Sequence, residues 1–174
     1  MINYPNVLIL GIDPGLTGAV VVIEIDVNIK QIVHVKFIDI PLVMKASGKN
    51  VLDCAELVQE LNDVLQPYVT FEKYAFVENV HSMPRQGVVG AFTFGKTVGI
   101  LHGVITALHI PLFDITPQKW KKQFSLIKCE KDDARKYVIK NYPFLEDQLK
   151  LKKHVDKADA FLIAVCGATH IGVL

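Results

Sequence analysis

The stretch Val7-Leu-Ile-Leu-Gly-Ile-Asp13-Pro-Gly-Leu-Thr-Gly-Ala19 predicts the start of the fold. The residues before Asp13 form a short, nearly continuous apolar run, which is typical of a strand covered on both faces of a sheet. Asp13-Pro-Gly then indicates a turn. The first strand therefore ends at an aspartate, directly before the chain turns.

Two further strands are predicted downstream, over residues 18–25 and 32–40, because both stretches are rich in β-branched residues and partly alternate. Residues 26–30 between them form the hairpin. No helix fits between the three strands, so they must form an antiparallel meander. We expect residues 41–50 to be a loop.

The rest of the chain alternates helices and strands. Asp53 and Glu56 have capping-box spacing before a helix that ends near Pro67, and Thr116-Pro117 is a second helix start. Strands are predicted at 74–77 and, near a sheet edge, at 110–115; helices are predicted at 88–109, 117–124, 131–141 and 156–169. The fold class is therefore α/β, a mixed five-stranded sheet with helices on both faces.

Composition excludes several protein classes. The 174 residues are 51% hydrophobic and 21% charged, which fits a single globular domain over residues 1–174 and excludes disordered and fibrous chains. The cysteines are scattered without zinc-ligand spacing. The start of the chain lacks the basic region of a signal peptide. The longest uncharged stretch, residues 97–113, is shorter than a membrane span and is expected to be a buried helix running into a strand. We expect a cytoplasmic protein with no membrane partner.

The charge is distributed unevenly. Residues 119–157 hold twelve Lys/Arg and six Asp/Glu, whereas the chain before them is net negative. A basic block of this kind predicts a polyanionic partner. A solvated helical face explains the same charges, and both interpretations stay open here. Trp120, the single tryptophan, lies in this block and is expected to anchor its helix to the core.

Four carboxylates are candidates for one site. Asp13 and Glu78 end predicted strands, and Asp156 and Asp159 share one face at a helix start. Each has an ordinary explanation as a turn or cap residue, although Glu78 at the end of a buried strand needs a partner. Together they form an oxygen-rich set that suits hard divalent cations.

These motifs resemble the RuvC family of Holliday-junction endonucleases, in the RNase H-like superfamily. The resemblance rests on Gly11-Ile-Asp-Pro-Gly-Leu-Thr-Gly-Ala19, on Val77-Glu78, and on Val155-Asp-Lys-Ala-Asp-Ala160, which occur in the family's order. It spans residues 7–170. The segment 81–103 looks more like the bacteriophage and prophage branch, so the expected setting is a bacterial cytoplasm or that of a phage host.

The resemblance implies a homodimeric nuclease that cuts four-way DNA junctions with two Mg²⁺ ions per site, for which Mn²⁺ is the expected substitute. Asp13, Glu78, Asp156 and Asp159 match the metal-binding and catalytic positions. His154 and Lys131 are implied as assisting groups, and Lys121, or its neighbour Lys122, matches a second functional lysine. The expected DNA contacts are Lys119, Lys121, Lys122, Lys131, Arg135, Arg85 and His81.

One departure from the family bears on junction selectivity. The cellular family has an aromatic residue three places after the glutamate, where this chain has His81. A nuclease of the same fold acting on forks, flaps or RNA–DNA hybrids is therefore the alternative. The first motif also resembles the phosphate loop of actin-like ATPases, but those need two such domains, so no nucleotide cofactor is expected.

A third feature concerns assembly. Gly95, Gly99 and Gly103 recur every four residues on one face of the helix predicted at 88–109. Small residues let another backbone approach closely, and the resemblance implies that this helix contributes to the dimer. Close packing of the helix on its own sheet is an equally good interpretation.

Overall fold

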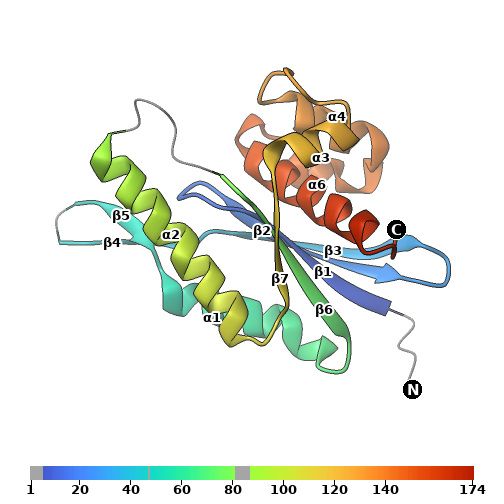
Figure 1. Cartoon of the computed structure of the whole chain (residues 1–174), viewed down its shortest axis with the longest axis horizontal. Coiled ribbons are helices and arrows are strands. Elements are labelled where there is room, and N and C mark those ends of the chain that lie inside the picture. Colours follow the sequence, from blue (N-terminus) through green and yellow to red (C-terminus); the bar gives the residue numbers. More distant parts are fainter. Residues whose placement is uncertain (1–5, 47, 81–86) are drawn as a thin grey trace.

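The computed structural model describes residues 6–46, 48–80 and 87–174, which build a sheet between two layers of helices (Figure 1). The sheet has the strand order β3-β2-β1-β6-β7. β1 pairs antiparallel with β2 and parallel with β6, which pairs parallel with β7. This confirms the predicted mixed α/β sheet. Its strands are β1 (Asn6–Asp13), β2 (Ala19–Asp26), β3 (Gln31–Asp39), β6 (Glu72–Glu78) and β7 (Leu112–Ile115).

Both faces of the sheet are covered, which explains the continuous apolar run of β1. Leu8 and Leu10 pack toward α1 and α2, whereas Val7 and Ile9 pack toward α3, α4 and α6. The longer helices are α1 (Cys54–Leu65), α2 (Val88–Ala107), α3 (Pro117–Gln123), α4 (Asp133–Asn141) and α6 (Val155–His170). The short helical segments are η1 (Gln66–Tyr68), η2 (Pro143–Leu145), α5 (Glu146–Leu149) and η3 (Lys152–His154).

The predicted helix starts have the expected caps. The Asp53 side chain accepts hydrogen bonds from the backbone N–H groups of Ala55 and Glu56 at the start of α1. Thr116 Oγ1 accepts from the backbone N–H of Lys119 at the start of α3. Each cap satisfies donors that the first helical turn leaves free, so the helix boundaries follow from local chemistry.

A glycine on β1 sets how closely α6 approaches the sheet. A Cβ added at Gly11 would lie 2.1 Å from the carbonyl oxygen of Ala160 and 2.6 Å from the backbone nitrogen of Ala164. Only a residue without a side chain fits there. The close approach places the start of α6 next to the end of β1.

The loop predicted at residues 41–50 is partly wrong. Leu42–Met44 (β4) and Asn50–Leu52 (β5) pair as a two-stranded antiparallel ribbon. A turn joins them, in which Gly48 adopts a φ of +75° and donates from its backbone N–H to the carbonyl of Lys45. The polar residues of the turn made the whole segment look like a loop in the sequence, but the short apolar segments on either side of the turn pair with each other.

The expectation of a buried helix at 97–113 is also only partly right. The buried residues of α2 are Thr97, Leu101, Val104 and Ile105, whereas Val88 and Phe92 are 86% and 75% exposed. The buried residues of α2 therefore all lie from its middle onward. By length and composition α2 is long enough to cross a membrane, but one such helix is a weak indication of a span.

The glycine face of α2 points into open space. A Cβ added at Gly95, Gly99 or Gly103 would meet no described atom within 4 Å. The interpretation that these glycines allow close packing on the helix's own sheet is therefore wrong, because the sheet contacts come from the buried residues on the other side of α2.

Candidate active site

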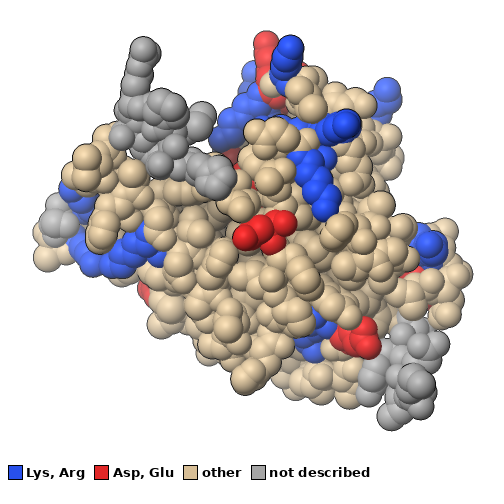
Figure 2. All heavy atoms as spheres, in the orientation of Figure 1, with Lys and Arg blue, Asp and Glu red and all other residues tan. Residues whose placement is uncertain are grey.

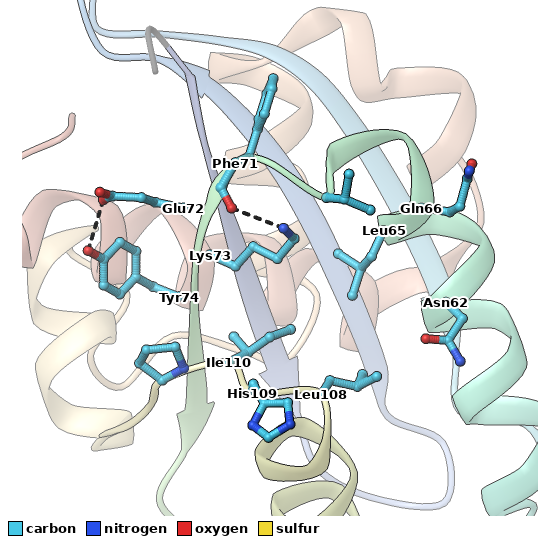
Figure 3. Close-up of a pocket in the computed structure, with 12 residues that line it drawn as sticks. Asn62, Leu65, Gln66, Phe71, Glu72, Lys73, Tyr74, Leu108, His109 and Ile110 are labelled. Atoms are coloured by element: carbon cyan, nitrogen blue, oxygen red, sulfur yellow. Dashed lines mark hydrogen bonds between the residues drawn. The ribbon is translucent and has the colours of Figure 1, made fainter. Parts of the chain in front are cut away.

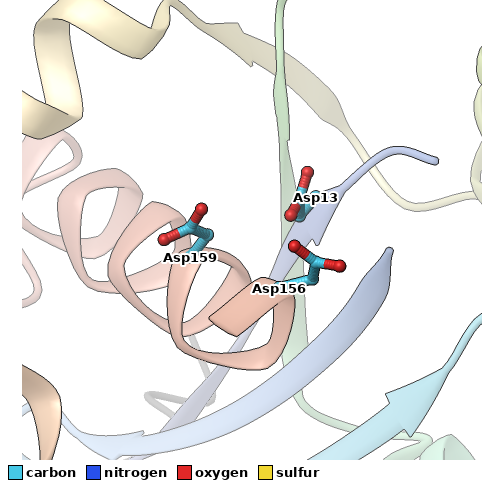
Figure 4. A group of neighbouring side chains, drawn as sticks. All are labelled: Asp13, Asp156 and Asp159. Atoms are coloured by element: carbon cyan, nitrogen blue, oxygen red, sulfur yellow. The ribbon is translucent and has the colours of Figure 1, made fainter. Parts of the chain in front are cut away.

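Three aspartates from two elements meet at the ends of the central strands. Asp13 is the last residue of β1, and Asp156 and Asp159 lie on the first turns of α6. Carboxylate oxygens of all three lie within 4.8 Å of one another, and Figure 4 shows the three side chains beside one another where β1 ends and α6 begins. The fourth carboxylate, Glu78, ends the neighbouring parallel strand, whose Val77 lies opposite Ile12.

One pocket of about 250 Å³ contains all four carboxylates. The turn after β1 supplies Gly15 and Thr17 to its wall. Side chains separated by more than 140 residues in sequence therefore line one concave surface. The parallel pairing of β1 with β6 and the close approach of α6 to Gly11 produce this arrangement.

The crowding changes the proton affinity of two aspartates. Burial, followed by the charges of Asp159, Glu78 and Asp156, raises the pKa of Asp13 well above its ordinary value. Burial and then the charge of Glu78 raise the pKa of Asp159 to about 7. Like charges in a poorly solvated pocket disfavour ionisation. The pocket therefore holds more negative charge than its protein surroundings neutralise.

A lysine from the segment before α4 partly compensates this charge. Lys131 Nζ lies 3.0 Å from Asp156 Oδ1, and that hydrogen bond raises the pKa of Lys131. The Lys131 side chain is 69% exposed, so it reaches into the pocket from solvent. A second hollow, lined by Trp120, Lys121, Lys131 and Asp159, adjoins the carboxylates. Both lysines implied by the resemblance thus lie beside the acidic cluster.

One contact in the site was not expected from the sequence. The indole N–H of Trp120 donates a hydrogen bond of 2.8 Å to Glu78 Oε1. Trp120 is 1% exposed, so it is the core anchor that we expected and also a partner of a site carboxylate. The signal in the sequence is a single tryptophan within a run of lysines, but nothing local connects it to a residue 42 positions earlier.

The residues fit a hard divalent cation. Asp159 Oδ1 is buried and has no hydrogen-bond partner among the described residues. Three carboxylates converge within bonding reach of a single ion, and a fourth lies in the same pocket. Mg²⁺ and Mn²⁺ prefer carboxylate oxygens, and a bound cation would relieve the repulsion between them. The pocket is thus a candidate metal centre.

Two solved structures have a similar fold. RuvC of Thermus thermophilus in complex with a Holliday junction substrate has a TM-score of 0.57 and 18% identity, over 95% of this chain and 97% of that chain. A second structure, Thermus thermophilus RuvC, has a TM-score of 0.54 with the same identity and coverage. The chain has the fold of RuvC. No protein-family model and no curated protein matches the sequence.

The basic residues expected to contact DNA differ in how exposed they are. Arg135 does not point outward, because its guanidinium pairs with Asp132 at 2.6 Å and donates to the Leu149 carbonyl. Its side chain is 11% exposed, so the structure gives it a role in holding α4 in place. Lys119 and Lys122 are exposed on α3, where Lys119 Nζ lies 3.2 Å from His170 Nδ1.

The remaining residues implied by the resemblance have mixed positions. His154 directly precedes α6, and its Nδ1 is buried without a hydrogen-bond partner among the described residues. Burial, followed by the charge of Lys157, lowers the pKa of His154. His81 and Arg85 lie outside the described residues.

A further cavity among the described residues lies away from the carboxylates. It measures about 660 Å³ and lies between the end of α1, the start of β6 and the segment after α2 (Figure 3). Lys73 Nζ, which donates to the Phe71 carbonyl, belongs to its lining. The start of β6 is the opposite end of the sheet from Glu78, so this cavity is separate from the candidate active site.

Proposed function

We propose that this protein is a metal-dependent endonuclease that resolves four-way DNA junctions as a homodimer. The observation that carries the proposal is the convergence of Asp13, Glu78, Asp156 and Asp159 in one pocket of a RuvC fold. The solved relative of that fold is bound to a Holliday junction, which supports branched DNA as the substrate.

The carboxylates would hold two divalent ions, Mg²⁺ by our proposal. When bound, such ions activate a water molecule and stabilise the leaving oxygen of a phosphodiester. Burial raises the pKa of Asp13 and of Asp159, and a bound cation would favour the charged form of both carboxylates. Lys131 offers an ammonium group at the rim of the pocket, where it would contact a phosphate of the strand being cut.

A basic surface next to the pocket supports DNA binding. Figure 2 shows Lys and Arg side chains gathered over the part of the molecule formed by α3 and α4. Lys121 lines the hollow that adjoins Asp159, and its Nζ lies 5.1 Å from the centre of the Trp120 ring. Lysines that contact phosphates position a duplex without reading its sequence. This agrees with a nuclease that selects a DNA structure.

The exposed face of α2 supports the dimer. Val88 and Phe92 are exposed there, and the glycines that follow present open backbone at helical spacing. A second copy of α2 packed against this face would bury apolar surface and give a two-fold axis. Two identical active sites related by that axis would cut two strands of like polarity in a four-way junction.

The test is cleavage of a labelled four-way junction beside a linear duplex, a fork and an RNA–DNA hybrid, with Mg²⁺ and with EDTA. We expect paired, symmetric nicks in the junction alone, and none with EDTA. If forks or hybrids were cut instead in a metal-dependent way, the proposed active site would stand, but junction resolution would be wrong as the function. No cutting of any of them would refute the nuclease.

The matched variant is Asp13→Asn, which removes one oxygen charge from the cluster without changing its size. We expect it to bind the junction with nearly unchanged affinity and to lose cleavage by at least about 100-fold, because the lysines are untouched while the metal site is broken. Asp147→Asn, on the exposed surface of α5, is the control and should cut normally. Cleavage by Asp13→Asn at the normal rate would remove Asp13 from the mechanism.

A further inference from the structure

Trp120 combines two properties: it is buried in the core, and it forms a hydrogen bond to a carboxylate of the candidate active site. It is the largest fully buried side chain of the described residues, and its ring belongs to the core below α6. The only polar atom of its side chain, the indole nitrogen, donates to Glu78 Oε1 at 2.8 Å. An indole N–H has one donor and no acceptor, so this bond holds a carboxylate oxygen in a single direction.

The bond acts on the carboxylate that lies outside the tight cluster. Asp13, Asp156 and Asp159 already have oxygens within 4.8 Å of one another, and Glu78 is not part of that group although it lines the same pocket. A glutamate has one more rotatable bond than an aspartate, so its carboxylate loses more freedom when it is held. Trp120 engages one of the two oxygens of Glu78, a residue that lines the pocket.

Hydrogen bonds from neighbouring residues orient metal ligands and tune their affinity. We propose that Trp120 is a positioning residue, whose indole N–H holds Glu78 in the direction needed to join the aspartates around a divalent cation. The inference rests on the proposed metal site but not on the choice of DNA substrate. Trp120 is 1% exposed, so the role we assign to it is exerted through Glu78 and not by direct contact with the metal or the DNA.

The experiment measures Mg²⁺ binding by calorimetry, without DNA, for the wild type, Trp120→Phe, Glu78→Gln and the double variant. Trp120→Phe keeps a buried aromatic ring and removes the donor. We expect it to weaken Mg²⁺ binding by about 10-fold to 100-fold. In the Glu78→Gln background the same substitution should change binding by less than about twofold, because the charged ligand that it positions is gone.

Phe124→Leu is the matched control, since Phe124 is another buried aromatic of the same core but is not a partner of Glu78. It should leave Mg²⁺ binding unchanged. Equal weakening by Trp120→Phe in both backgrounds, or equal weakening by Phe124→Leu, would show a merely structural role and overturn the proposal. Absence of Mg²⁺ binding in the wild type would instead refute the metal site on which the proposed function rests.

A second measurement needs no variant at position 120. The chain contains one tryptophan, so its ¹H–¹⁵N spectrum contains one indole signal. We expect that signal to move as Mg²⁺ is added, to saturate with the affinity found by calorimetry, and to shift in Glu78→Gln. An indole signal that ignores both Mg²⁺ and the Glu78 substitution would overturn the proposal even if Trp120→Phe failed to fold.

Discussion

Among the single side chains, Asp159 carries the clearest consequence for stability. Its pKa is raised to about 7, whereas an aspartate of an unfolded chain titrates near about 4. Between these values the folded protein binds a proton that the unfolded chain does not. Stability from this group is therefore full below the unfolded pKa and is lost as the pH rises through about 7. Asp13, with a pKa raised by the same cause, adds to the effect.

We therefore predict that the protein in EDTA unfolds more easily at about pH 8 than at about pH 6, and that Mg²⁺ reverses most of the difference. Thermal unfolding monitored by circular dichroism measures this. Asp159→Asn should flatten the pH dependence, because an amide does not titrate. A stability that rises with pH in EDTA would contradict the raised pKa.

Lys131 illustrates a competition within the same pocket. Its ammonium group pairs with Asp156, which by our proposal is also a metal ligand. We predict that Lys131→Met binds Mg²⁺ more tightly in the absence of DNA, because a competing cation is removed. The same variant should cut a junction on the order of 100-fold more slowly, because a charge that contacts the phosphate is lost.

Calorimetry and single-turnover cleavage measure the two effects of Lys131→Met. Lys45→Met, at an exposed lysine between β4 and β5 and outside the basic surface of α3 and α4, should change neither. If Lys131→Met lowered both metal affinity and cleavage, Lys131 would be supporting the pocket and not competing for it.

Among the elements, the contact between β1 and α6 determines whether the site exists. Gly11 allows the backbones to touch, and a Cβ there would overlap the Ala160 carbonyl oxygen. We predict that Gly11→Ala lowers the free energy of unfolding by about 3 kcal/mol, because the helix must move away from the strand. Urea unfolding measures this.

The displaced helix in Gly11→Ala should also weaken Mg²⁺ binding, since Asp156 and Asp159 move with α6. Gly87→Ala is the control, because its added Cβ meets no described atom within 4 Å and its φ of −60° suits alanine. It should change stability by less than about 1 kcal/mol. Equal stability of Gly11→Ala and the wild type would mean that α6 does not depend on this approach.

At the scale of the whole molecule, the prediction to test is that two copies form a homodimer through α2. We predict that Gly99→Leu gives a folded monomer, since its side chain points into open space within one copy and would separate two copies packed through α2. Analytical ultracentrifugation measures the mass. In the same variant, paired cutting of a junction should become two independent nicks, because each monomer then acts alone.

Gln59→Leu, which places the same side chain on the exposed surface of α1, controls for added hydrophobicity and should leave the dimer intact. A Gly99→Leu protein that remains a dimer with unchanged dissociation would place the interface elsewhere.

Much of this molecule could be predicted from its sequence, because the signals are local. The apolar run before Asp13, the caps at Asp53 and Thr116, and the spacing of Asp156 and Asp159 act within a few residues. They determined the order of the strands and helices and the four carboxylates proposed for the site. The ribbon of β4 and β5 was not predicted, because each of its strands has only three residues and shows no clear alternation.

Only the tertiary structure decided which distant residues contact one another and which faces of the helices stay exposed. The Trp120–Glu78 bond joins residues 42 positions apart, and the Lys131–Asp156 pair joins a loop to a helix start. Arg135 turned out to be held by Asp132, and the glycine face of α2 turned out to be open. Such contacts depend on how distant elements pack, and a local pattern of residues carries no record of that packing.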